Sequence, residues 1–197
     1  MRRQLLWTRL DAHGLDHCRV SSNAARGGGT RVQGTVVTRF DGHPATVAYE
    51  IRADREWRTR ALDVTVHGQQ TGRLSLVTDD PGEWEVEAGQ AGTDVAGPVD
   101  VDLAATPFTN TLPIRRLDLG VGEAADVPVV YVSAPDLTVS VADQRYTRLG
   151  PAGDGERYRY ENATSGFEAE ITVDAEGFVV SYPGLYDRVA SVGDDVA

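Results

Sequence analysis

Side chains that can bind anions and hydroxyl groups gather at two places in this chain, and the first is Trp57–Arg60. Arg58 and Arg60 share the parity of the apolar residues that follow from Leu62 onward. If this strand is regular, both guanidinium groups start on its apolar face, where a buried Arg requires a carboxylate or another anion. A bulge just after Trp57 would reverse that parity, so this alternative stays open.

The second place is the stretch from Thr106 to Leu117. Thr106 is followed by two prolines that bracket a run of hydroxyls and one amide, including Asn110 and Thr111, and Arg115 and Arg116 come soon after. Small polar groups of this kind form directional hydrogen bonds to sugar hydroxyls, and adjacent arginines can clamp a phosphate or carboxylate. The alternative is a loop whose hydroxyls satisfy its own backbone.

Two carboxylates precede that stretch. Asp100 and Asp102 lie on one face of a predicted strand, about 7 Å apart by strand rise. They could form an acid–base pair, or they could simply be the wet face of an amphipathic strand. We expect Asp102 to pair with an arginine inside the fold, the candidates being Arg58, Arg60, Arg115 and Arg116.

Motifs of the common catalytic and cofactor-binding sites are absent from the sequence. It contains no G-x-S-x-G, no phosphate-binding loop with its Lys, no H-E-x-x-H and no C-x-x-C. The sequence therefore predicts no catalytic residue, no metal and no cofactor.

The charge of the chain restricts its partners. Acidic residues number 30 against 19 basic ones, which gives a net charge of -11, and every basic residue is Arg. A surface of this sign repels nucleic acid and anionic lipid, so we expect neither nucleic-acid binding nor stable membrane insertion. An excess of carboxylates without Lys indicates a salt-adapted, halophilic protein with an acidic surface.

The elements that must position these residues are strands. Apolar and polar residues alternate repeatedly, as at Val47, Tyr49 and Ile51, and Gly, Pro and Asp separate the runs. We predict an all-β fold of at least ten strands in hairpin order, with a short helical turn within 106–117. So many strands in one sheet must curl or close, and a half-open curl leaves a concave apolar face that a ligand or a second layer of the same sheet must fill.

The chain is expected to form a single β domain over residues 1–197, with a frayed tail at 191–197. No apolar run reaches the 18 or more residues of a membrane helix, and no export signal precedes the first strand. Cys18 is the only cysteine, so no intrachain disulfide exists. These features predict a cytoplasmic location and leave the oligomeric state open.

The central stretch resembles a known family. Asp100–Leu103 followed by Thr106–Leu117 is similar to the signature block of the putative glycolipid-binding family, which was formerly a domain of unknown function. Trp57–Arg60, Val130–Val132 followed by Pro135, and Tyr182–Tyr186 fit the same pattern. The resemblance implies one large curved antiparallel sheet that forms a half-barrel or open barrel, similar to bacterial lipoprotein carriers. By position it implies these ligand-binding residues: Trp57, Arg58, Arg60, Asp102, Thr106, Asn110, Thr111, Arg115, Arg116 and Tyr182.

We therefore expect a non-enzymatic binding protein. A glycolipid or similar amphipathic ligand would lie in the concave face of the curved sheet, with its polar head against the Thr/Asn loop and the arginines. Two alternatives remain. The first is an enzyme acting on a lipid or sugar conjugate, with Asp100 or Asp102 as acid or base and Arg115 or Arg116 stabilising an anion. The second is a structural or interaction module whose concavity is filled by its own side chains.

Overall fold

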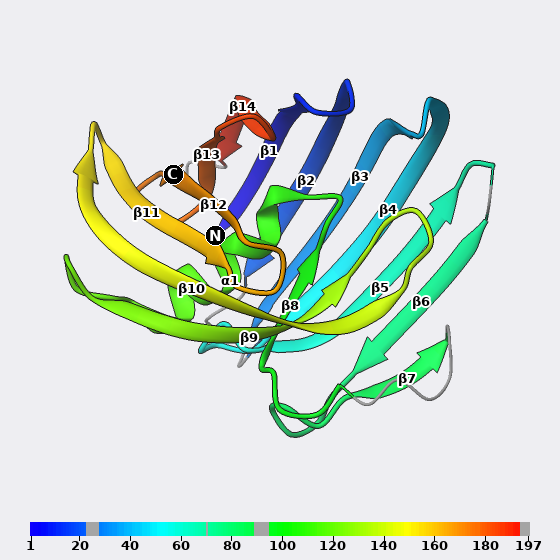
Figure 1. Cartoon of the computed structure of the whole chain (residues 1–197), viewed down its shortest axis with the longest axis horizontal. Coiled ribbons are helices and arrows are strands. Elements are labelled where there is room, and N and C mark those ends of the chain that lie inside the picture. Colours follow the sequence, from blue (N-terminus) through cyan, green and yellow to red (C-terminus); the bar gives the residue numbers. More distant parts are fainter. Residues whose placement is uncertain (23–27, 70, 89–94, 194–197) are drawn as a thin grey trace.

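A single sheet of 14 strands forms almost the whole molecule (Figure 1). The structure is a computed structural model that describes residues 1–22, 28–69, 71–88 and 95–193. The predicted all-β class is confirmed. The strands are β1 Arg2–Arg9, β2 Gly14–Ser22, β3 Thr30–Phe40, β4 His43–Ala53, β5 Thr59–His67, β6 Gly72–Val77, β7 Glu85–Ala88, β8 Asp100–Leu103, β9 Ala124–Val132, β10 Val139–Ala152, β11 Gly155–Asn162, β12 Phe167–Val173, β13 Val179–Tyr182 and β14 Tyr186–Gly193.

Period-two alternation produces these strands, as predicted. In β2 and β3 buried and exposed residues alternate along nearly the whole strand. Every second side chain points to the same face of a strand. One face of the sheet therefore collects the apolar side chains and the other remains in water.

The order of strands in the sheet is β7-β6-β5-β4-β3-β2-β1-β14-β13-β12-β11-β10-β9-β8. Neighbours in sequence pair as antiparallel hairpins, as expected, and the exception is β8, which runs parallel to β9. The first strand pairs with the last, so Arg3 lies opposite Gly193. The first three residues of the predicted frayed tail, 191–193, instead belong to β14, and residues 194–197 lie outside the described part.

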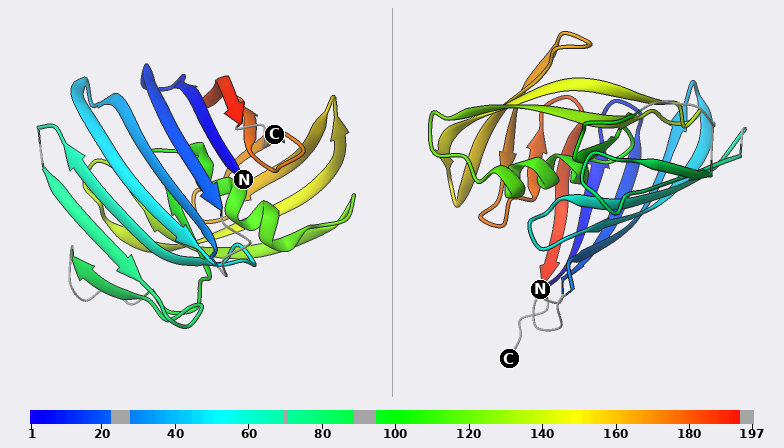
Figure 2. Two further views of the ribbon diagram at one scale, coloured as in Figure 1. Left: turned by 180° about the vertical axis from the view of Figure 1, so that it is seen from behind. Right: turned by 90° about the horizontal axis from the view of Figure 1, so that it is seen from below.

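The sheet curls into a half-barrel that does not close (Figure 2). Its two edge strands are β7 and β8. Inside the curl lie a short 3-10 helix, η2 (Pro107–Asn110), and α1 (Thr111–Leu117), which confirms the predicted helical turn. The Thr106 hydroxyl accepts a hydrogen bond from the Phe108 amide at the start of η2, and Asp118 ends α1 in a left-handed conformation. Both are standard ways of satisfying backbone groups at helix ends.

One close approach positions the interior. Gly34 in β3 lies opposite Tyr49 in β4, and a Cβ atom at Gly34 would lie 2.1 Å from the tyrosine ring. Only glycine leaves room for the ring to lie flat across the neighbouring strand. The Tyr49 hydroxyl is thereby directed to the inner side of β2.

Candidate binding site

The concave face of the sheet is occupied by the chain itself. Residues 104–118, which we call the inner segment, run through the curl, and Phe108, Leu112 and Ile114 are buried there within the main apolar cluster. The apolar residues of the sheet beneath them are buried as well. The ligand expected in the concave face would therefore compete with the inner segment for the same apolar surface.

Buried polar contacts fix the start of the inner segment. Thr106 donates to the carboxylate of Asp16 over 2.5 Å, and the Tyr49 hydroxyl donates to the same carboxylate over 3.1 Å. Asp16 is fully buried, and burial raises its pKa to about 7 although both hydrogen bonds oppose the shift. Within the described residues no cation pairs with it. Thr106 is therefore an anchor of the inner segment rather than an open hydroxyl.

A second polar group fixes the middle of the segment. Asp102 accepts hydrogen bonds from the Thr109 hydroxyl at 2.9 Å and from the Gln144 amide at 2.7 Å. Asn110 accepts one from the Tyr146 hydroxyl at 2.9 Å. Burial raises the pKa of Asp102, and the two hydrogen bonds partly counter that rise. These groups lie between the inner segment and strands β8 and β10.

The ion pair expected at Asp102 forms at Asp100 instead. Arg116 lies 2.6 Å from the Asp100 carboxylate, which is fully buried, and donates to it through two nitrogens. Desolvation raises the pKa of Asp100, and Arg116 opposes that rise. The choice of Asp102 was wrong: both carboxylates lie on the same face of β8, so strand parity does not distinguish them, and Thr109 and Gln144 are the partners of Asp102 in place of an arginine.

The parity prediction for Arg58 and Arg60 is also wrong, and the bulge that we left open is present. Arg52 pairs with Ala61 but Ala53 pairs with Thr59, so Arg60 is the extra residue of β5. As a result Thr59 faces the interior, and Arg60 bonds Asp54 at 2.9 Å near the surface. Arg58 is exposed.

The remaining predicted residues fall into separate regions. Thr111 is fully buried in α1, and its hydroxyl has no partner within the described residues. Trp57 and Arg115 contact each other, with the guanidinium carbon 4.2 Å from the centroid of the indole ring. Tyr182 is buried in an aromatic cluster on another part of the sheet. The structure therefore does not assemble the predicted site residues around a single cavity.

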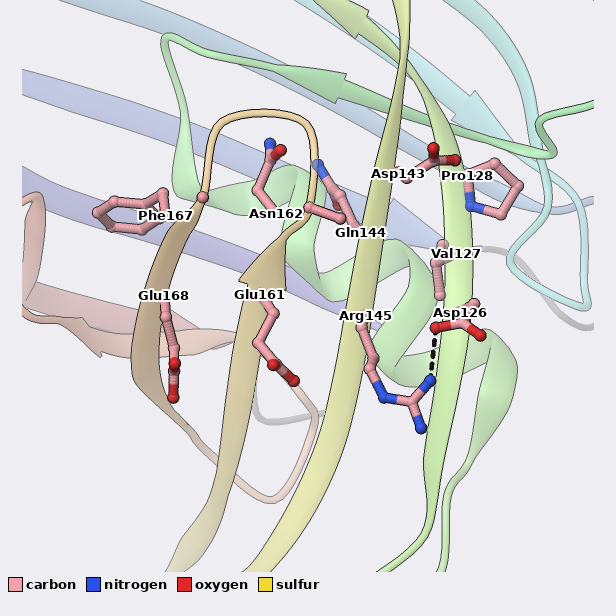
Figure 3. Close-up of a pocket in the computed structure, with 12 residues that line it drawn as sticks. Asp126, Val127, Pro128, Asp143, Gln144, Arg145, Glu161, Asn162, Phe167 and Glu168 are labelled. Atoms are coloured by element: carbon pink, nitrogen blue, oxygen red, sulfur yellow. Dashed lines mark hydrogen bonds and ion pairs between the residues drawn. The ribbon is translucent and has the colours of Figure 1, made fainter.

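A pocket lies beside that aromatic cluster, and we call it the rim pocket (Figure 3). Its volume is about 400 Å³, and four adjacent strands, β9 to β12, provide its walls. One row across these strands consists of Val127, Gln144, Asn162 and Phe167, which are paired in register. Phe167 keeps 40% of its surface exposed.

Aromatic rings support Phe167 from behind. Its ring centroid lies 6.3 Å from that of Tyr160 and 6.1 Å from that of Tyr182, and Tyr160 also contacts Tyr146 edge-on at 5.3 Å. Ring pairs at such distances attract each other beyond simple burial. The rim pocket thus combines an exposed ring on a rigid aromatic base with the partly exposed amide of Asn162, and charged residues such as Glu161 and Glu168 complete its walls.

Sequence reasoning missed Asp16 and Gln144. Both lie on the buried face of their strands. Asp16 shares that face with Cys18 and Val20, and Gln144 shares it with Ala142 and Tyr146. A polar residue at an apolar position of a strand is the signal that would have found them, because burying such a group requires a partner.

No group of three His, Cys, Asp or Glu side chains in the described parts is arranged to hold a metal ion. In the same parts no helix is long and apolar enough to cross a lipid bilayer.

The fold and its pockets define a class: an open, single-sheet β half-barrel whose hollow is filled by its own chain and whose rim carries small pockets. The chain belongs to the family described as "Putative glycolipid-binding", whose model matches residues 4–188. It is similar to the crystal structure of a DUF1089 family protein from Pseudomonas aeruginosa. That likeness has a TM-score of 0.73 and 32% identity, over 88% of this chain and 92% of the other. None of the curated proteins compared with the chain matches it.

Proposed function

We propose that this protein binds an amphipathic small molecule such as a glycolipid and does not convert it chemically. The single observation that carries the proposal is the rim pocket with the exposed Phe167 on its aromatic base. The description of the family supports the ligand class. Ligand pockets are typically apolar, with a few polar groups that fix orientation, and their volumes start at about 300 Å³.

The two parts of such a ligand find complementary groups at the rim. Phe167 offers apolar contact for a chain or for the apolar face of a sugar ring, and Asn162 offers its partly exposed amide to hydroxyl groups. With a volume of about 400 Å³, the pocket accommodates one sugar ring or a short piece of chain rather than a whole lipid.

Energetics favour the rim over the hollow. To enter the concave face, a ligand must displace Phe108, Leu112 and Ile114, which are nearly inaccessible to solvent. Exposing three such side chains costs roughly 5–9 kcal/mol in total, at about 1.5–3 kcal/mol each. The ligand would have to recover this cost before any net binding occurred.

The carboxylates of β8 support binding over catalysis. A general acid or base must come within hydrogen-bonding distance of its substrate. Asp100 is fully buried against Arg116, and both oxygens of Asp102 already accept hydrogen bonds. Both groups thus serve the packing of the inner segment.

The test is a titration with n-octyl β-D-glucoside below its micelle concentration, followed by calorimetry and by amide chemical shifts. We expect saturable binding, with shifts at the rim pocket, and at least tenfold weaker binding in Phe167→Ala. The matched control is Val37→Ala, since Val37 is a 57% exposed apolar residue on β3, far along the sheet. Binding should be unchanged in that control.

Two results would refute the proposal. Equal binding by Phe167→Ala and the wild type would show that the rim pocket is not the site. Failure of the glucoside to bind, together with no lipid in native mass spectra of protein purified from its own host, would favour the alternative of a self-filled structural or interaction module. The filled concave face is the observation in favour of that alternative.

A further inference from the structure

A second pocket lies at the opposite end of strands β10 and β11, and we call it the Arg115 pocket. Its volume is about 370 Å³, and its walls include Trp57, Arg115, Asp118, Arg148 and Tyr158. Arg148 follows Gln144 of the rim pocket by four residues on β10, which corresponds to about 13 Å along a strand. The two pockets are therefore separate sites.

Two turns of identical construction border the Arg115 pocket. In each turn an Asp carboxylate accepts hydrogen bonds from the amides two and four residues later, and the amide three residues later bonds the Asp carbonyl. The Asp is Asp54 between β4 and β5, and Asp174 between β12 and β13. The third residue after it has positive φ in both turns, 64° at Trp57 and 78° at Gly177.

Arg115 of α1 lies between these two turns. Its guanidinium stacks on the Trp57 ring at 4.2 Å, and it donates a hydrogen bond to the carbonyl of Glu176. Gly177 permits the approach of the second turn, since a Cβ atom there would lie 3.0 Å from Cγ of Arg115. The side chain is thus held in place from both sides at the edge of the pocket.

The carboxylates around the pocket are mostly neutralised by other arginines. The pairs are Glu156 with Arg148 at 2.9 Å, Asp174 with Arg188 at 2.5 Å, and Glu176 with Arg3. Within the described parts of the chain, Arg115 has a carbonyl and a ring as partners but no carboxylate. The exposed carboxylate of Asp118 is the one negative group of the pocket wall without such a pair there.

We propose that the Arg115 pocket binds a small polyhydroxylated oxyanion, such as a sugar that carries one carboxylate or phosphate group. A guanidinium held flat presents a fork of donors that matches these anions, and stacking fixes it before the ligand arrives. The volume exceeds what a bare phosphate needs, and the polar walls suit hydroxyl groups rather than an acyl chain. The proposal does not depend on the rim pocket.

The experiment is calorimetric titration of the wild-type protein with glucuronate, glucose 1-phosphate, glucose and inorganic phosphate in separate runs. We expect glucuronate or glucose 1-phosphate, or both, to bind at least tenfold more tightly than glucose and inorganic phosphate. The two acidic sugars distinguish a carboxylate from a phosphate head.

Variants test the role of Arg115. Arg115→Gln should weaken binding of the acidic sugar at least tenfold, whereas Asp118→Asn should strengthen it twofold or more by removing the opposing charge. Asn adopts positive φ readily, so Asp118→Asn should preserve the helix end at φ 45°. Arg157→Gln is the matched control, because Arg157 lies next to Tyr158 on β11 but forms an exposed pair with Glu170. Its binding should equal that of the wild type.

The proposal is wrong if neither acidic sugar binds the wild type, or if glucose binds equally well. It is also wrong if Asp118→Asn leaves the affinity unchanged, and this result is informative even if Arg115→Gln does not fold. Binding of inorganic phosphate as tightly as the sugars would overturn the assignment of the ligand as a sugar. Phe167→Ala should bind the acidic sugar normally, so failure here is distinct from failure at the rim pocket.

Discussion

Removal of Arg116 should be among the most damaging single substitutions in this chain. Its partner Asp100 has no exposed side-chain surface, and their contact is 2.6 Å. In Arg116→Ala the carboxylate remains buried without its cation. Breaking one side of a buried pair typically costs about 3–5 kcal/mol. With a urea slope of about 2 kcal/mol per molar, the unfolding midpoint should fall by roughly 1.5–2.5 M.

The stability lost in Arg116→Ala should depend on pH. Burial raises the pKa of Asp100 already in the wild type, and loss of Arg116 raises it further. The folded variant then binds a proton that the unfolded chain releases at lower pH, so its stability falls as pH rises through the folded pKa. Urea unfolding at pH 5 and pH 8 should therefore show a larger deficit at pH 8.

Arg157→Gln serves as the reference, because it breaks an exposed 3.6 Å pair in which both side chains are about half accessible. Such pairs contribute about 0–1 kcal/mol. If Arg116→Ala lost no more stability than this reference at pH 8, our reading of the buried pair would be refuted.

Three further outcomes are expected. Asp16→Asn should flatten the dependence of unfolding free energy on pH between about 4 and 7, because the raised pKa of Asp16, about 7, makes the folded wild type lose stability as pH rises through that range; an unchanged urea-denaturation profile would contradict this. Gly34→Ala should lower the melting temperature far more than Gly42→Ala, since a Cβ atom meets Tyr49 at 2.1 Å in the first case and nothing within 4 Å in the second, where only a φ of 82° adds strain of about 1 kcal/mol. With a net charge of -11, the protein should melt at a higher temperature in molar salt than in dilute buffer, and equal melting temperatures would argue against salt adaptation.

The strands and the inner helix could be predicted from the sequence because their signals are local. The alternation at Val47, Tyr49 and Ile51 in β4 and the prolines of the stretch from Thr106 to Leu117 each depend on neighbouring residues only. Strand number indicated that the sheet must curl or close, and the family resemblance implied the open half-barrel. These features needed no knowledge of distant contacts.

The site could not be predicted in the same way. A bulge at Arg60 shifts parity without changing composition, and Asp100 and Asp102 lie on the same face of β8, so parity cannot tell which of them meets an arginine. The hydroxyl of Thr106 would suit a ligand equally well, and only its distance from Asp16, 90 residues earlier in the chain, shows that it is already satisfied. Long-range packing decided each of these positions.

The pairing of β1 with β14 has a consequence for how the chain reaches this structure. Every other antiparallel pair in the sheet joins strands that are adjacent in sequence, so those strands can pair as local hairpins while the chain is being synthesised. The edge of β1 that pairs with β14, however, stays unpaired until β14 has been synthesised. An open strand edge of this kind can pair with other chains. Joining Gly193 to Arg2 through a short linker and opening the chain at another turn would convert the most distant pairing into a hairpin. Such a permuted chain should fold faster and aggregate less while it is being made.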